Sequence, residues 1–340
     1  MLVLLIKNIG EVKSMKNKTV EYGKYGYIFI APFFIVFAVF QLYPLIYTIW
    51  LSFCENYYRG LTQVEPTFIG LKNYLGVLIN TDSQYKIAEG AKWFDTMTIM
   101  SISNTMKIWL LNFVPQVLLS LLLASWFTDI AVKLKLQSTF KVMMFMPNII
   151  TAASIAVLFY SLFARSGPVA GLLRSTGIID SEYDFMESKT GTIGLIAFMQ
   201  FWMWYGNTMV ILIAGILGIN PSLYEAARVD GANSKQSFFS ITLPLLMPII
   251  QFTLVTSAIG GLQMYDIPAL FNVSGTGDAL PAYASQTITM YIRKLGFTTK
   301  DMGKAAAASM ILFFVTLLIS LVFYVLTRDK ETKQKHAVIK

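Results

Sequence analysis

A short polar segment around Glu225 lies between two long apolar runs, and its residue types suit a contact with another protein. Ser222 and Glu225 have the S-x-x-E spacing of a capping box, which predicts a helix that starts there with its first-turn N–H groups already bonded. Leu223, Ala227 and Gly231 fall at i, i+4 and i+8 and would line one helix face with little side-chain bulk. Such a bare face is suited to docking in a cleft of a partner. The alternative is that Glu225 merely caps a connecting helix.

A second group of candidates consists of polar and aromatic residues inside apolar runs, where such side chains mark a path for a solute. One helical face carries two amides around an indole, and another carries hydroxyls and a glycine. An indole packs on the C–H face of a sugar ring, and amides bond to its hydroxyls. The alternative is an interfacial aromatic belt with small residues that serve helix packing. The first face holds Gln200, Trp204 and Asn207 at i, i+4 and i+7, and the second holds Thr253, Ser257, Gly261 and Met264.

The chain lacks the residue types that most catalytic and metal sites need. The chain has one histidine, His336 in the charged tail, and one cysteine, Cys54. A histidine-dependent triad, a cysteine metal cluster and an intramolecular disulfide are therefore excluded. The sequence contains no G-x-x-x-x-G-K-[ST] phosphate-binding loop. We predict no catalytic residue, no metal site and no cofactor in this chain, and if ATP drives it, the ATPase is a separate polypeptide.

The elements that carry the candidate residues are predicted to be membrane-spanning helices. Hydrophobic residues make up 55% of the 340 residues and the mean hydropathy is +0.59, which excludes an ordinary soluble enzyme. A helical span needs about 20 largely apolar residues. Prolines inside such runs are tolerated in a helix bundle. The sequence thus predicts an all-α membrane protein, a bundle of six transmembrane helices at about 27–51, 108–127, 145–163, 194–217, 245–264 and 305–326.

Basic residues are distributed unevenly between the loops. With both termini on the inside face, the inside segments hold 15 Lys and Arg in 78 positions, and the outside segments hold 11 in 111. The positive-inside rule then favours cytoplasmic termini and puts the segment 220–244 in the cytoplasm. We expect a cytoplasmic segment 1–24, a single transmembrane domain 25–328 and a cytoplasmic tail 329–340. The net charge of +8 reflects this topology, and no basic patch interleaved with aromatics indicates nucleic-acid binding.

Several segments resemble the permease subunits of binding-protein-dependent ABC importers. Glu225-Ala226-Ala227, Gly231 and Ile241-Thr242-Leu243-Pro244 are similar to the family's EAA loop, which carries E-A-A, a glycine and then I-x-L-P. Phe68-Ile69-Gly70-Leu71-Lys72-Asn73-Tyr74 resembles the F-x-G-L-x-N-Y segment of sugar-type permeases, and Ser103-Asn104-Thr105 resembles the opening of their second span. The segment at 303–309 resembles their G-x-A-A-A-x-S entry to the last span. The resemblance runs from about residue 25 to 328, and it departs from the family at 274–278, where another Gly-rich loop replaces T-x-G-G-P.

The resemblance implies a type I importer permease of the maltose and multiple-sugar group, in the bacterial cell membrane. It implies a second homologous permease subunit in a heterodimer, two cytoplasmic ATPase subunits that bind ATP and Mg, an extracellular solute-binding protein and a surrounding lipid bilayer. It favours span four as part of the path of a sugar or oligosaccharide, because related sugar permeases hold their ligand on spans four and five and on the span before them. The contact with the ATPases would be made by Leu223, Tyr224, Glu225, Ala226, Ala227, Asp230, Gly231 and Ala232.

Two alternatives for the transported solute and the energy source remain open. Related importers carry glycerol phosphate esters, so the solute could be of that class instead of a sugar. An ion-coupled secondary transporter is the second alternative, but it usually needs carboxylates or broken helices near mid-membrane. The ionisable residues expected inside the spans, Lys107 and Asp266, lie at their predicted outer edge.

Overall fold

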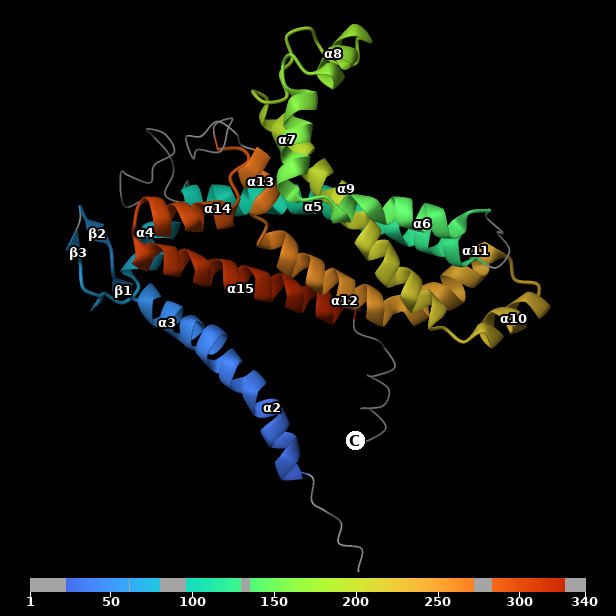
Figure 1. Cartoon of the computed structure of the whole chain (residues 1–340), viewed down its shortest axis with the longest axis horizontal. Coiled ribbons are helices and arrows are strands. Elements are labelled where there is room, and N and C mark those ends of the chain that lie inside the picture. Colours follow the sequence, from blue (N-terminus) through green and yellow to red (C-terminus); the bar gives the residue numbers. More distant parts are fainter. Residues whose placement is uncertain (1–22, 61, 80–95, 130–134, 272–282, 328–340) are drawn as a thin grey trace, which may run out of the picture. The chain divides into compact units, whose positions relative to one another are not determined.

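The computed structural model describes residues 23–60, 62–79, 96–129, 135–271 and 283–327. The chain divides into two compact units, which are drawn in Figure 1 and comprise Met1–Thr48 and Ile49–Lys340. Most of the expected N-terminal segment, the tail with His336 and the departing loop at 274–278 lie outside the described residues.

Six helical stretches of the described chain are long and apolar enough to cross a membrane, which confirms the predicted bundle. Spans one, four and six agree with their predicted limits to within a few residues. Spans two, three and five differ from their predicted limits by more than a few residues. The stretches are Tyr25–Ser52, Met97–Thr128, Ala152–Ser175, Lys189–Leu217, Ser234–Phe271 and Met302–Thr327.

The described part of the first unit is one continuous apolar helix that contains a π-helical turn. α2 (Gly23–Phe37) passes through a π-helical turn, η1 (Ala38–Leu42), into α3 (Tyr43–Ser52), whose last residues belong to the second unit. Pro44 lacks an N–H group and its ring collides with the carbonyl four residues back in an α-helix. The wider π turn just before Pro44 lets the helix continue. The side chains of α2 are apolar and largely exposed, which is typical of a helix in a membrane.

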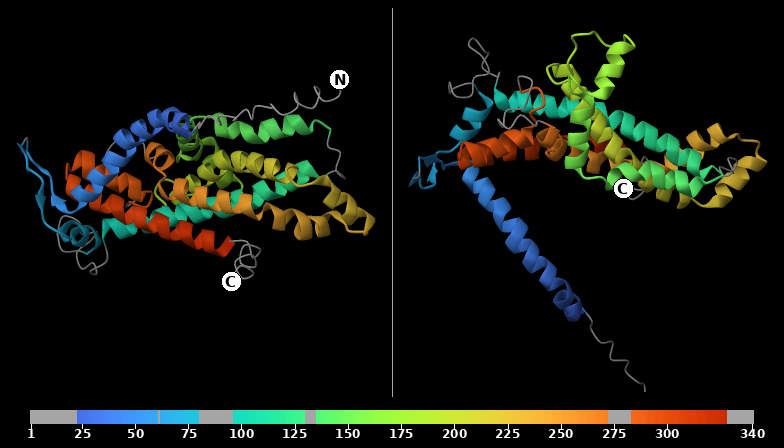
Figure 2. Two further views of the ribbon diagram at one scale, coloured as in Figure 1. Left: turned by 90° about the horizontal axis from the view of Figure 1, so that it is seen from below. Right: turned by 45° about the horizontal axis from the view of Figure 1, so that its top comes forward.

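The second unit is built on two pairs of long helices. α5 (Met97–Thr128) packs along α9 (Lys189–Leu217), and α12 (Leu243–Leu262) packs along α15 (Met302–Thr327), as Figures 1 and 2 show. Their buried side chains form one main apolar core, to which the shorter helices α7 (Ala152–Phe163), α13 (Asp266–Phe271) and α14 (Ile288–Arg293) also contribute. This unit also contains the short helix α8 (Pro168–Ser175) and a π turn, η5 (Lys294–Thr298).

The second span begins at Met97, well before the start predicted at 108, so Ser103-Asn104-Thr105 lies inside the helix and does not open it. Polar side chains in these first turns bond to the segment before α14 and to the first residue of α14. The Thr105 hydroxyl accepts the Ile288 N–H at 2.9 Å, and the Asn104 amide donates to the Tyr283 carbonyl at 2.9 Å. Buried polar groups are stable when they form hydrogen bonds. These bonds allow the polar residues 97–107 to belong to the buried helix, although the apolar run predicted from the sequence begins only at 108.

The third span starts later than predicted because Pro147 interrupts it. α6 (Gln137–Phe145) ends in a 3₁₀ turn, η3 (Met146–Ile149), that contains this proline. α7 then starts anew, with the Thr151 hydroxyl accepting the Ser154 N–H as an N-cap. The apolar run from 145 to 163 is therefore two helical pieces and not one.

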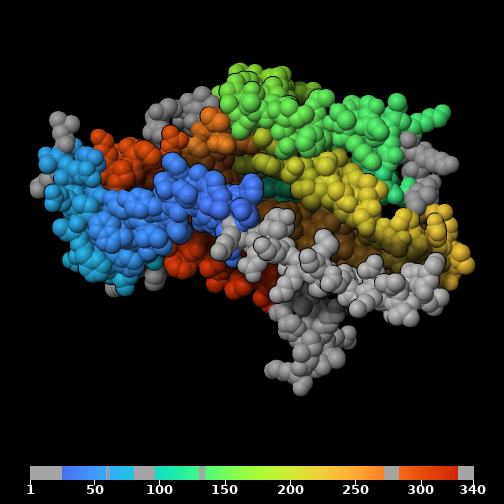
Figure 3. All heavy atoms as spheres, turned by 60° about the horizontal axis from the view of Figure 1, so that its bottom comes forward, coloured from blue at the N-terminus to red at the C-terminus, as the bar shows by residue number. Residues whose placement is uncertain are grey.

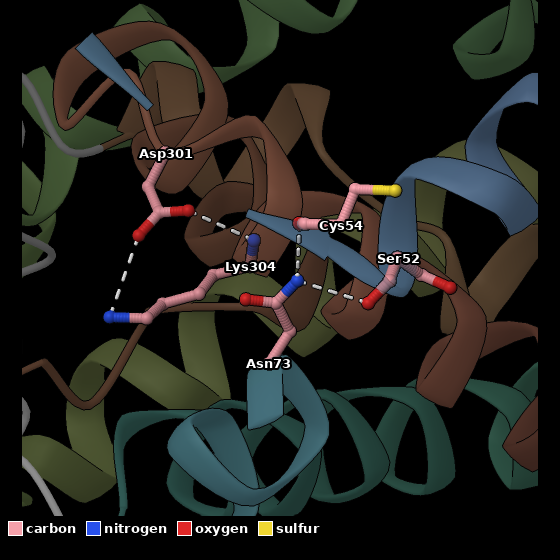
Figure 4. A network of polar contacts seen from close by, with 5 residues as sticks. All are labelled: Ser52, Cys54, Asn73, Asp301 and Lys304. Atoms are coloured by element: carbon pink, nitrogen blue, oxygen red, sulfur yellow. Dashed lines mark hydrogen bonds and ion pairs between the residues drawn. The ribbon is translucent and has the colours of Figure 1, made fainter. Parts of the chain in front are cut away.

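Two sequence motifs that are distant in the chain meet after the first span (Figure 4). The Asn73 amide, in α4 (Lys72–Leu78), donates to the carbonyls of Ser52 at 3.0 Å and Cys54 at 2.8 Å. Gly303, at the start of α15, lies against the same place, where an added Cβ would come to 2.9 Å from the Asn73 amide nitrogen. Asn73 and Gly303 thus fasten the end of span one to the start of span six.

Small antiparallel ladders complete this region. β1 (Cys54–Glu55) pairs with β4 (Thr67–Phe68), and β2 (Tyr58–Arg59) pairs with β3 (Thr62–Gln63). In Figure 1 these strands and α4 lie at one end of the long helices of the second unit, and α10 (Pro221–Val229) lies at the other end.

Candidate functional site

The predicted docking helix is present as α10, but it begins differently from the prediction. Its N-cap is Asn220, whose side-chain oxygen accepts the N–H of Ser222 at 3.1 Å. The predicted capping box of Ser222 with Glu225 is therefore wrong, because Ser222 is already the second helical residue. Asparagine is among the strongest N-caps and proline is favoured at the first helical position, so Asn220-Pro221 starts the helix earlier.

The end of α10 corrects a second expectation. The helix ends at Val229, and the Ala232 N–H bonds to the Ala227 carbonyl at 2.9 Å while the Gly231 N–H bonds to the Arg228 carbonyl at 3.1 Å. These two bonds make a Schellman ending. Gly231 has a φ of 79°, a left-handed conformation that glycine adopts without steric cost. Gly231 therefore ends the helix, and the prediction that it extends a bare helical face is wrong.

The outer side of α10 is uncovered by the rest of the described chain. No residue of α10 is buried there, and Val229 is 88% exposed. In the space-filling view of Figure 3, the yellow segment that contains α10 lies at the edge of the coloured elements. The side chains of Glu225 and Asp230 are exposed and have no hydrogen bond or ion pair to other described residues. The predicted coupling residues from Leu223 to Ala232 thus share one exposed helix and its terminal turn.

Tyr224 links α10 to the beginning of the fifth span. Its hydroxyl lies 2.9 Å from the Thr242 hydroxyl. Thr242 is buried and is the last residue of a π turn, η4 (Phe238–Thr242), that continues directly into α12. The segment before η4 is α11 (Ser234–Ser237), and it carries the capping box of this region, formed by Asn233 and Gln236. The hydroxyl contact between Tyr224 and Thr242 therefore joins α10 to the fifth span, although no residue of α10 is buried.

The predicted solute-path residues come together in one cavity of about 440 Å³. They reach it from two helices that are far apart in the sequence. α9 supplies Gln200, Trp204 and Asn207, and α12 with the residues just after it supplies Thr253, Ser257, Gly261 and Met264.

Several polar groups of the cavity wall have no partner among the residues that the structure describes. Gln200, Asn207 and Ser257 have no side-chain hydrogen bond to any described residue. Trp204 is 46% exposed. Thr253 differs, because its hydroxyl bonds to the Ile249 carbonyl within its own helix at 2.9 Å. The cavity therefore presents two amides, a hydroxyl and an indole with free bonding capacity.

Gly261 has a packing role in addition to its place on the cavity wall. A Cβ at this position would overlap the Trp109 indole of α5 and would come to 2.6 Å from its nitrogen. Glycine thus lets α12 approach α5 closely, which is the role of small residues in membrane helix packing.

The cavity has a third wall, on α5, whose residues were not among those predicted from the sequence. Asn112 and Gln116 both line the cavity and are 6% exposed. The Gln116 amide donates to the Thr208 hydroxyl of α9 at 2.8 Å, and the Asn112 amide donates to the Ile108 carbonyl at 2.9 Å. Two amides at i and i+4 inside an apolar span were the signal that could have identified them.

Charge is scarce around the cavity. Among the described residues that line it, Asp266 is the only charged one. Arg293 lies nearby, but its guanidinium is placed over the Tyr265 ring at 4.9 Å from the centroid and donates to the Tyr265 hydroxyl. The described residues contain no group of three His, Cys, Asp or Glu side chains that could hold a metal ion.

Comparisons with known proteins bear on both sites. The sequence pattern of the binding-protein-dependent transport system inner membrane component matches residues 106–331. The chain is 28% identical over 312 residues to the lactose transport system permease protein LacF of Rhizobium radiobacter, covering 91% of this chain and 96% of LacF. It is 28% identical over 298 residues to the arabinooligosaccharides transport system permease protein AraP of Bacillus subtilis, covering 87% of this chain and 86% of AraP.

A solved structure has the same fold. It is that of a bacterial ABC transporter involved in the import of the acidic polysaccharide alginate, with a TM-score of 0.70 and 22% sequence identity over 96% of this chain and 98% of that chain. The matched family pattern covers most of the spans and includes α10 and the cavity helices α9 and α12. The chain therefore belongs to the family of binding-protein-dependent transport system inner membrane components, and it is an inner-membrane permease subunit of an ABC importer whose ATPase is a separate chain.

Proposed function

We propose that this permease carries a neutral sugar or oligosaccharide through the cavity between α9, α12 and α5. The observation that carries the proposal is that two amides, Gln200 and Asn207, share one cavity with the Trp204 indole and have no hydrogen bond to the described part of the chain. Amides bond to sugar hydroxyls, and an indole packs on the apolar face of a sugar ring. The names of the relatives LacF and AraP refer to lactose and arabinooligosaccharides, which supports the same class of solute.

The charge of the cavity wall favours a neutral solute over a phosphate ester. Binding sites for phosphate groups use arginine, lysine or helix N-termini, because a desolvated anion must be paired. The described residues of the wall include one carboxylate, that of Asp266, and no Lys or Arg. Arg293 contacts Tyr265 near the cavity but is not among the residues that line it. A glycerol phosphate ester is therefore the less supported alternative, and the family of the chain sets aside the ion-coupled transporter.

The residues of α10 and its terminal turn are proposed to couple this permease to the ATPases. Glu225 and Asp230 are exposed and unpaired among the described residues, so both carboxylates are available to basic groups of a partner. We expect the complete importer to contain a second homologous permease in a heterodimer, two cytoplasmic ATPases that bind ATP and Mg, and a solute-binding protein outside the membrane. ATP-driven closure of the ATPases would move α10 and tilt the spans attached to it.

The solute class is tested with the complete importer in proteoliposomes, supplied with its binding protein. Uptake and stimulated ATP hydrolysis are measured with neutral oligosaccharides, with uronic acid oligosaccharides and with glycerol phosphate esters. We expect neutral oligosaccharides to be transported and to stimulate hydrolysis. Transport of the phosphate esters or the acidic sugars in their place would contradict the proposal.

A further inference from the structure

The position of α10 raises the question of how its movement reaches the membrane spans. Turns with glycine join the helix to both neighbours, at Gly218 after α9 and at Gly231 before α11. A side-chain contact between α10 and a span would transmit movement more directly.

The bond between Tyr224 and Thr242 is such a contact. The two hydroxyl oxygens are 2.9 Å apart, and either group can donate. Thr242 is 5% exposed, and its other side-chain contact, to the Ser237 carbonyl, is long at 3.5 Å. The Tyr224 hydroxyl is therefore the principal partner of a buried hydroxyl group, which without it would keep only the long contact with the Ser237 carbonyl.

The local helix geometry places Thr242 on the side that faces α10. η4 is a π turn, with the Leu243 N–H bonded to the Phe238 carbonyl. This widened turn comes just before Pro244, where an ordinary α-helical turn would bring the ring against a carbonyl. After the π turn the helix runs on without interruption as α12 to Leu262. At about 1.5 Å per residue, Thr253 on the cavity wall lies about 16 Å along the same helix from Thr242.

We propose that the Tyr224–Thr242 hydrogen bond is the joint through which movement of α10 is passed to α12 and hence to the cavity. Tyr224 and Thr242 are positioning residues in this scheme, and neither touches the solute. The inference rests on the proposed coupling role of α10.

The test is a double-mutant cycle in the complete importer, reconstituted in proteoliposomes with its binding protein and a transported sugar. Tyr224→Phe, Thr242→Val and the double variant are compared by the number of sugar molecules taken up per ATP hydrolysed. Tyr160→Phe and Thr316→Val are the matched controls, because each removes a hydroxyl that has no hydrogen bond to a described residue. Each single variant should lower the number of sugar molecules taken up per ATP by about five-fold, the factor expected for one lost hydrogen bond. The double variant should show the same loss as either single variant, because both substitutions remove the same bond.

A merely structural bond predicts a different pattern. It would lower the yield of assembled complex and leave sugar per ATP unchanged, which would overturn the proposal. The proposal would also be overturned if the double variant lost sugar per ATP by the product of the two single losses, because the two side chains would then act independently. Thr242→Ser keeps the hydroxyl and should retain full coupling. It is the variant to be measured at this position if Thr242→Val fails to assemble.

Glu225→Gln separates the failure of this inference from failure of the coupling role itself. Glu225 is exposed and unpaired among the described residues, so its substitution leaves the fold intact. If Glu225→Gln uncouples the importer and Tyr224→Phe does not, α10 couples by another route. If neither changes sugar per ATP, α10 is not the coupling helix.

Discussion

Replacement of Trp204 by alanine is expected to impair transport far more than it impairs folding. A fully buried tryptophan truncated to alanine costs about 3–5 kcal/mol of unfolding free energy. Trp204 is 46% exposed on a cavity wall, so its removal enlarges an existing space and should cost well below that range. Loss of an aromatic contact is worth about 0.5–1.5 kcal/mol, which corresponds to a roughly two- to twelve-fold loss of affinity for the sugar in the cavity.

The assay is sugar uptake per assembled complex in proteoliposomes, with basal ATP hydrolysis measured in the same vesicles. Trp204→Ala should lower uptake and keep basal hydrolysis. Ser257→Leu should have a similar effect for another reason, because it fills part of a cavity of about 440 Å³ without removing an aromatic contact. The control is Trp126→Phe, at an exposed tryptophan near the end of α5 that does not line the cavity.

A packing role for Trp204 would give the opposite result. The variant would then assemble poorly or unfold at lower temperature, and the surviving complexes would transport at the full rate. Unchanged uptake per complex for both Trp204→Ala and Ser257→Leu would refute the reasoning and move the path elsewhere.

Other positions give predictions of their own. Gly231→Leu forces a left-handed conformation that costs roughly 1–2 kcal/mol, so co-purification of the ATPases should weaken, and unchanged co-purification would show that the end of α10 does not matter. Gly261→Ala should lower the thermal unfolding temperature by pressing on Trp109 at a cost of about 1–3 kcal/mol, whereas Gly260→Ala, with open space at its Cβ, should not. Burial raises the pKa of the Cys54 thiol, so less thiolate is present at any given pH. Maleimide should therefore label the unmodified protein very slowly until the pH is raised. Rapid labelling at neutral pH would contradict the burial of Cys54.

The positions of side chains on a single helix could be predicted from the sequence, because they follow from the helical periodicity. Gln200, Trp204 and Asn207 share a face because they lie at i, i+4 and i+7 of a single helix. Thr253, Ser257 and Gly261 follow the same rule on α12, whereas Met264 lies just beyond the end of that helix at Leu262. An apolar surrounding makes the polar residues of these faces conspicuous. The convergence of the two faces on one cavity is a property of helix packing, which the sequence alone does not contain.

Local signals failed where two of them competed or where a partner lies far along the chain. Ser222 with Glu225 matched a capping box, but Asn220-Pro221 is a stronger start and took precedence. Gly231 fitted a helical spacing, yet the left-handed turn at a helix end uses glycine more often. Asn73 and Gly303 were separate motifs in the sequence, and only the fold brings them together.

The central claim, that sugar occupies the cavity between α9 and α12, is tested most directly by protection of a single introduced cysteine. Ser257→Cys places a thiol on the cavity wall, and Cys54 is buried, so labelling reports on the new site. The rate of modification by a small thiol reagent is measured in the complete importer, with and without the transported sugar and its binding protein. We predict that sugar slows modification of Ser257→Cys several-fold and leaves Ser234→Cys, on exposed α11 outside the cavity, unaffected. Equal rates at Ser257→Cys with and without sugar, under conditions where transport is measured, would contradict the account.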